Sequence, residues 1–255
     1  RSAPPTGRDA DRRLDVQGAG LAVAGLGGLC FGLIEGPEHP LAGALAAGVG
    51  LLALGAFVQR VRAVEHAMIP ADIFRSRAFV EANLLTAAVY FALSGTVFLA
   101  MLRLQYGLGL SALEAGLGLL PFTLAVAGLS RWAGRRSAQG ETRALLGGGP
   151  LLAALGIVGL AALEPGERIW IRLLPAMSLV GLGMAAVVAP LTSAVFAAAS
   201  PERAGAASGI NNAVSRVAGL LAVAALALLG GGRAEPEADL LATTQAGLLG
   251  AAAVM

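Results

Sequence analysis

Long apolar stretches recur along this chain, and they leave few folds open to it. The stretch at residues 213–230 carries a single charged side chain, Arg216, close to its start. A helix rises ~1.5 Å per residue and the hydrocarbon core of a bilayer is ~30 Å thick, so about 20 mainly apolar residues can cross it. Strands of a membrane barrel would instead alternate apolar and polar residues. The pattern therefore predicts an all-α polytopic membrane protein.

Eight such spans are expected, and the last is incomplete. Composition agrees with lipid as the solvent, because 56% of the residues are hydrophobic and 13% are charged, whereas a soluble domain is about 25% charged. The chain opens on a polar segment at Arg1, and its final apolar run is too short to cross comfortably. We therefore expect a fragment with a truncated last helix. The spans lie at about 16–34, 41–58, 80–102, 112–129, 144–163, 171–196, 213–230 and 241–255.

The basic residues predict the orientation of the spans. All 18 are arginines, and thirteen of them lie in residues 1–15 and in the loops 59–77, 130–143 and 200–212. Cytoplasmic loops carry an excess of Lys and Arg. We therefore expect these loops and the connecting segment 1–15, with the N-terminal end, to be cytoplasmic. No basic cluster is interleaved with aromatic side chains, so nucleic acid is not an expected partner.

The longest cytoplasmic connection, residues 59–77, is the expected domain linker. It separates two spans from the six that follow. This predicts a two-helix transmembrane insert at 16–58 and a bundle at 78–255. The core of the linker, Ile69 to Phe74, suggests an amphipathic surface segment that breaks at Pro70, because proline cannot continue a helix.

A polar stripe marks the third span. Asn83, Thr86, Tyr90 and Ser94 are spaced 3, 4 and 4 residues apart, which places them on one face of a helix. Such a stripe can form a wall of a substrate cavity. It can equally supply hydrogen bonds that hold neighbouring helices together. The pattern leaves both interpretations open.

A second stripe leads into the span at 213–230. Small or polar residues recur there at helical spacing, and this predicts a seam where another helix approaches closely. Asn211 and Arg216 flank the seam near its cytoplasmic end, where a long side chain can also reach lipid headgroups. The seam comprises Gly205, Ser208, Asn212, Ser215, Gly219 and Ala222.

Residues that carry chemistry are scarce. None of the 16 acidic residues lies clearly inside a span, and the nearest are Glu35, Glu81 and Glu114. A proton relay needs a carboxylate within the membrane, which this chain does not clearly contain. The two histidines lie in separate loops and Cys30 is the single cysteine. We therefore expect no enzyme activity, no cofactor and no metal site.

Three motifs in a fixed order give the chain a family resemblance. They are DIFRSRAFVEANLLTAAVY at 72–90, LQYGLGLSALEAGLGLLPFTL at 104–124, and the segment 188–224, which contains PERAGAASGINNAVSR. The chain resembles the second half of the fourteen-span drug:proton antiporters of the major facilitator superfamily. The resemblance begins near Leu14 and covers nearly the whole sequence.

This resemblance implies a function. The first two spans would be the extra pair between two six-helix halves, and the following spans the C-terminal bundle. The expected activity is proton-coupled efflux of drugs or other amphipathic small molecules by alternating access, in a bacterial inner membrane. The expected partners are the small-molecule substrate, protons, the lipid bilayer and a missing N-terminal half, which would carry the proton-linked carboxylate.

The resemblance and the stripes together imply roles for individual residues. The expected substrate path comprises Asn83, Thr86, Tyr90, Ser94, Gln105, Asn211 and Asn212. The residues expected to act in gating are Gly116, Pro121, Gly134, Arg135, Pro190 and Arg216.

One loop departs from the family pattern. The connection between the fourth and fifth spans often carries Gly-x-x-x-Asp-Arg in the family, whereas this chain reads GRRSAQ from Gly134 to Gln139. Arg135 or Arg136 could replace that charged clasp only in part, so gating through this loop is in question.

Two other functions remain open from the sequence. The first is a dedicated exporter of one metabolite, lipid or siderophore with the same fold. The second, from a different class, is a membrane scaffold that transports nothing. Substrate breadth separates the first from a multidrug exporter, and an upstream transporter half would argue against the second.

Overall fold

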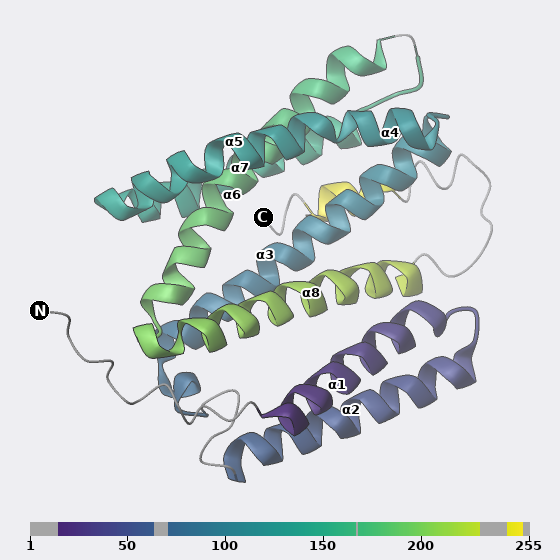
Figure 1. Cartoon of the computed structure of the whole chain (residues 1–255). Coiled ribbons are helices and arrows are strands. Elements are labelled where there is room, and N and C mark those ends of the chain that lie inside the picture. Colours follow the sequence, from purple (N-terminus) through teal and green to yellow (C-terminus); the bar gives the residue numbers. More distant parts are fainter. Residues whose placement is uncertain (1–14, 64–70, 167, 230–243, 252–255) are drawn as a thin grey trace, which may run out of the picture.

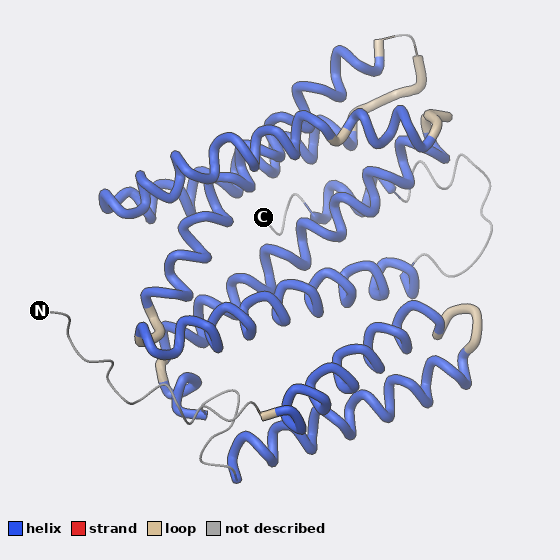
Figure 2. The backbone as a smooth tube through the Cα atoms, in the orientation of Figure 1, coloured by secondary structure: helices blue, strands red, loops and turns tan. Residues whose placement is uncertain are grey.

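The described part of the structure is built from helices alone. The structure is a computed structural model, and it describes residues 15–63, 71–166, 168–229 and 244–251, in which every regular element is helical (Figure 2). The α-helices are α1 (Val16–Glu35), α2 (Pro40–Ala63), α3 (Arg77–Leu102), α4 (Ala112–Gly118), α5 (Leu120–Arg136), α6 (Thr142–Ala161), α7 (Ile169–Ala197) and α8 (Ala204–Leu229). The short turns are η1 (Ala71–Arg75), η2 (Arg103–Gly107), η3 (Ser137–Glu141) and η4 (Pro201–Arg203).

The predicted membrane protein is confirmed, with six helical runs in the described residues long and apolar enough to cross a bilayer. One run, Ala112–Ala161, contains more than one helix, because Gly140 has a φ of 96° and interrupts the helical path between α5 and α6. Most predicted spans fall close to the observed helices, but α8 begins at Ala204, well before the predicted start of its span at residue 213. Residues 244–251 are helical within the predicted last span. The predicted boundaries of the insert, linker and bundle remain predictions.

The predicted span at 112–129 differs from the structure. It is divided at Leu119 into α4 and α5, and α5 continues to Arg136, beyond the predicted end. Pro121 lies in the first turn of α5. Proline has no N–H to donate to the preceding turn, which disfavours a continuous helix at this position, whereas the first turn of a new helix tolerates proline.

The helices are arranged around α7 and α3. Helix α7 packs against α5 and α6, α3 packs against α8, and a smaller contact joins α3 to α7. The hairpin of α1 and α2 lies along the opposite side of α8, which α1 touches (Figure 1). Helix α8 therefore lies between the hairpin and the rest of the bundle.

Two buried clusters hold the bundle together. The larger lies where α3, α6 and α7 meet and includes Leu99, Ile157 and Leu173. The smaller lies at the other end of α3, where Ile73 and Phe79 pack with residues of α7 and α8. Ile73 is 2% exposed, so the predicted surface segment is partly buried in the bundle. Its first residues, with Pro70, lie outside the described residues.

Direct backbone contact holds the α1–α2 hairpin. A Cβ atom built on Gly32 would lie 2.7 Å from the carbonyl oxygen of Gly43, and one on Gly50 would lie 2.7 Å from the nitrogen of Leu29. Real Cβ atoms do not approach so closely, so glycine alone fits these positions. The hairpin thus follows the small-residue packing of membrane helices.

An ion pair closes the open end of the same hairpin. The Asp15 carboxylate accepts from the backbone N–H of Gly18 at 2.8 Å and from Nε of Arg60 at 2.9 Å. Its side chain is 4% exposed. A Cβ on Gly18 would lie 2.3 Å from that carboxylate. One acidic residue therefore caps α1 and joins it to the end of α2.

The glycine contacts predict a difference between two substitutions in α1. Gly32→Ala should destabilise the protein by about 1–3 kcal/mol, because the added methyl group collides with the backbone of α2. Gly27→Ala is the matched control, since a Cβ there meets nothing within 4 Å and alanine favours a helix by up to ~1 kcal/mol. Thermal unfolding in detergent measures both. Equal melting temperatures for the two variants would contradict the close packing of the hairpin.

Candidate functional site

A polar junction joins α3 to α8. Nδ2 of Asn211 donates to Oγ1 of Thr86 at 3.0 Å and to Oδ1 of Asn83 at 3.4 Å. Asn83 and Thr86 are buried, with 8% and 1% of their surface exposed. Each also donates one turn back along α3, Asn83 to the carbonyl of Phe79 and Thr86 to that of Ala82. Three residues of the predicted substrate path thus bond two helices together.

The remaining residues of the α3 stripe differ in their surroundings. Ser94 is half-buried and faces α8, where a Cβ on Gly219 would lie 2.7 Å from its Oγ. Tyr90 is half-buried, and within the described residues no hydrogen bond of its hydroxyl is found. The stripe therefore combines interhelical contacts with one tyrosine hydroxyl open to another partner.

The seam predicted on α8 follows the observed contact only in part. Ala207, Ala218 and Ala222 are buried, and Gly219 approaches α3. Gly205, Ser208 and Asn212, however, are exposed. The first half of α8 turns its apolar side toward the smaller cluster, since burying Ala207 and Ile210 there places the polar residues on the other side of the helix. Asn212 and Arg216 are one turn apart on that exposed side.

At the far end of α3, Arg103 is a buried residue whose importance the sequence did not reveal. It is 5% exposed, and its guanidinium donates to the carbonyls of Ala161 at 3.0 Å and Leu163 at 2.6 Å, at the end of α6. The last carbonyls of a helix lack internal donors and carry partial negative charge. The sequence signal was an arginine two residues before Gln105, just beyond the predicted end of the apolar span at residue 102.

Gln105 lies in the same turn, η2, two residues after Arg103. It is half-buried, and its Nε2 donates to the sulfur of Met101 at 3.8 Å. The turn is of the wide π type, which is frequent at functional positions. Gln105 is therefore separated from the α3–α8 junction by the length of the helix.

The residues predicted for gating are not gathered in one place. Pro190 is buried in α7 and Pro121 begins α5, whereas Gly116, Arg135 and Arg216 are exposed and Gly134 is half-buried. In the loop that departs from the family pattern, Arg136 pairs with Glu141 at 2.7 Å and stacks over Trp132 at 5.5 Å. Arg136, rather than Arg135, therefore forms the charged contact of this loop.

The chemistry available to the described residues is limited. Their carboxylates lie at helix ends, as in the Asp15–Arg60, Arg77–Glu81 and Arg203–Asp72 pairs. Within the same ranges, no group of three or more His, Cys, Asp or Glu side chains could hold a metal ion. The polar groups described above can hydrogen-bond to a neighbouring helix or to a passing molecule.

Comparison with known proteins identifies a family and several relatives. Residues 15–223 match the Major Facilitator Superfamily. The methylenomycin A resistance protein of Streptomyces coelicolor is 30% identical over 222 residues, 85% of this chain and 46% of that protein. The cephamycin export protein of Amycolatopsis lactamdurans is 33% identical, over 89% and 48% of the two chains. The puromycin resistance protein of Streptomyces alboniger is 32% identical, over 84% and 44%. The chain spans about half the length of these relatives.

The α3–α8 junction predicts an energetic coupling. Asn211→Ala and Thr86→Val should each lower the free energy of unfolding. The decrease in the double variant should be smaller than the sum of the two single decreases by ~0.6 kcal/mol, the typical strength of such a hydrogen bond in a membrane. Asn212→Ala is the neighbouring control and should change the free energy of unfolding by less than about 0.5 kcal/mol. Strictly additive losses would show that the two side chains do not interact.

The burial of Arg103 predicts a large loss on substitution. Arg103→Met removes the donors for the Ala161 and Leu163 carbonyls and should destabilise the protein by about 2–3 kcal/mol. Arg168→Met serves as the control, because Arg168 is exposed and its side chain forms no ion pair or hydrogen bond within the described residues. Thermal unfolding of both purified variants measures the difference, and a wild-type melting temperature for Arg103→Met would contradict the assigned role.

Proposed function

The chain belongs to the Major Facilitator Superfamily, and from this premise we propose that it forms one half of an exporter of antibiotics or other amphipathic small molecules. Transport would be coupled to protons and would follow alternating access, in which two bundles rock around a site between them. The observation that carries the proposal is the match over residues 15–223, together with relatives whose names record antibiotic resistance or export.

The exposed polar face of α8 supports a cavity on that side. Ser208, Asn212 and Arg216 are exposed and lie four residues apart, so they share one face of a helix. The part of α8 that follows Arg216 is apolar. Polar groups on a membrane helix almost always face protein or water rather than lipid. We therefore propose that this face borders the path between this bundle and a second one.

The positions of the acidic groups bear on proton coupling. Among the described residues, carboxylates lie at helix ends and in ion pairs rather than in the middle of a span. We propose that the proton-linked carboxylate belongs to the partner half of the transporter. The arginine distribution supports an orientation with the α2–α3 and α5–α6 connections on the cytoplasmic side.

Movement between the two states needs helices that bend. Proline inside α7, at Pro175 and Pro190, removes backbone donors and permits such bends. We propose that Pro190, buried among the bundle helices, and Pro121, at the α4–α5 break, are the bending points. The Arg136–Glu141 pair would restrain the cytoplasmic end of α5 in one of the states.

The proposal predicts gradient-dependent efflux. Cells that express the full-length gene product should expel a fluorescent cationic dye, and an uncoupler should abolish the efflux. Tyr90→Ala and Asn212→Ala should change the rate severalfold at unchanged expression, because both side chains would border the path. Ser193→Ala is a suitable control, since the Ser193 hydroxyl already donates to the carbonyl of Ala189 within α7.

Different results would lead to different conclusions. Efflux of one antibiotic but no dye would identify a dedicated exporter instead of a multidrug exporter. Efflux that survives the uncoupler would contradict proton coupling. No movement of any compound under any gradient would contradict export itself.

A further inference from the structure

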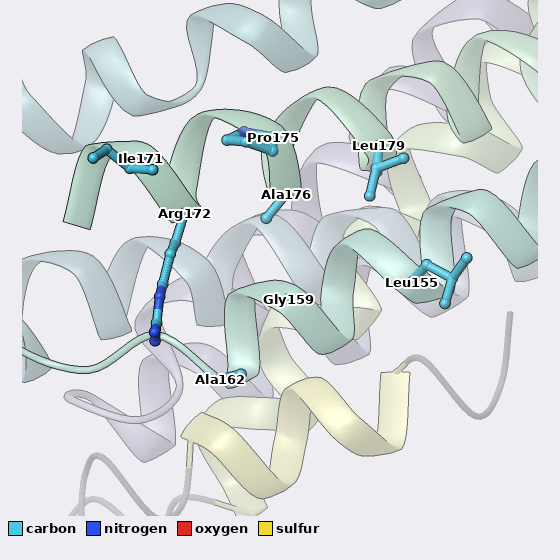
Figure 3. A pocket seen from close by; sticks show the side chains of 8 residues that line it. All are labelled: Leu155, Gly159, Ala162, Ile171, Arg172, Pro175, Ala176 and Leu179. Carbon is cyan, nitrogen blue, oxygen red and sulfur yellow. The ribbon is translucent and has the colours of Figure 1, made fainter. Parts of the chain in front are cut away.

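A shallow apolar groove runs between α6 and α7 (Figure 3). Its volume is about 350 Å³, at the lower end of the range for small-molecule sites. Leu155 and Ile171 form its rims and are 61% and 69% exposed. Gly159 and Ala176 form part of its lining, where the absence of long side chains leaves the space open.

The groove has a charged end. Arg172 lies among its lining residues, and its side chain extends from α7 toward Ala162 at the end of α6 (Figure 3). The carbonyls of Ala161 and Leu163 at this helix end already accept from Arg103. In the part of the chain that the structure describes, Arg172 forms no ion pair. The guanidinium is exposed and open to an external anion.

The surroundings of Arg172 favour the binding of an anion. It lies in the first turn of α7, a 29-residue helix with no acidic residue in that turn, so the partial positive charge of the helix end adds to its own. Arg168 precedes it by one turn. Pro175 has no N–H to offer the carbonyl of Ile171, so this carbonyl lacks its usual helical donor.

We propose that this groove binds an anionic phospholipid, with an acyl chain along the apolar lining and the phosphate on Arg172. A groove on a membrane-spanning bundle meets lipid before any other ligand. Its apolar length suits a hydrocarbon chain and its single basic end suits one phosphate, because arginine near the membrane surface attracts anionic headgroups. With the orientation proposed above, the lipid comes from the outer leaflet.

Native mass spectrometry of the full-length gene product in a neutral detergent tests this binding. Phosphatidylglycerol and phosphatidylcholine with identical acyl chains are titrated separately. The wild-type protein should bind phosphatidylglycerol about fivefold more tightly, the effect expected of one basic residue near the membrane surface. Arg172→Gln should remove this preference without weakening phosphatidylcholine binding, and Arg172→Lys should restore most of it.

Two further variants separate the groove from general surface charge. Arg168→Gln removes an arginine from the same helix end, but Arg168 does not line the groove, so the preference should persist. Ala162→Leu places bulk in the groove and should weaken both lipids. The three substituted positions, Ala162, Arg168 and Arg172, are exposed, and unchanged melting temperatures would establish that the four variants fold.

The outcomes that overturn the proposal are specific. Retention of the preference in Arg172→Gln, or an equal loss in Arg168→Gln, would assign the binding to general charge. Displacement of phosphatidylglycerol by millimolar inorganic phosphate would indicate a site for a free anion. The test measures binding alone, so its failure would leave the proposed export standing, and a failure of export would leave the lipid site standing.

Discussion

Helices in lipid gain little from burying apolar surface against each other, because lipid tails are as apolar as their side chains. This fold therefore depends on close backbone contact at small residues. The hairpin uses Gly32 and Gly43 in this way. Helix α7 does the same on two sides, since a Cβ on Gly183 would lie 2.4 Å from the Gly149 carbonyl of α6, and one on Gly181 would lie 2.8 Å from the Phe122 carbonyl of α5. Most of the helix arrangement follows from where glycine permits contact.

The dependence on small-residue contacts explains how much of the fold could be predicted from the sequence. Apolar length and the positions of charged residues were enough to predict a helical membrane protein and to locate its spans, because both follow from the thickness of the bilayer. It was harder to predict which face of each helix contacts a neighbouring helix. The small residues of α8 formed a regular seam in sequence, yet Gly205 and Ser208 are exposed while Ala207 and Ile210 are buried. Periodicity identifies a face but not the helix that covers it.

The candidate site shows the same limit at the level of single side chains. Asn211 and Asn212 are adjacent and chemically identical, yet one bonds α3 and the other is exposed. Successive residues of a helix differ by 100° in the direction of their side chains, so the two asparagines face different surroundings. The sequence pattern had predicted that both lie on the substrate path. Arg103 escaped notice for the opposite reason, because its partners are backbone carbonyls, which no sequence pattern displays. The family resemblance, in contrast, rested on whole motifs and was confirmed at the level of the superfamily.

The contact of Arg103 with the end of α6 also constrains how the chain can be assembled. Its carbonyl partners, Ala161 and Leu163, follow it by 58 and 60 residues. When α3 enters the bilayer during synthesis, those partners have not yet been made, and the guanidinium must remain in water or among headgroups. It can move inward only after α6 has crossed the membrane and presented its last turn. The end of α3 that carries Arg103 can thus reach its final packing only after α6 has been made.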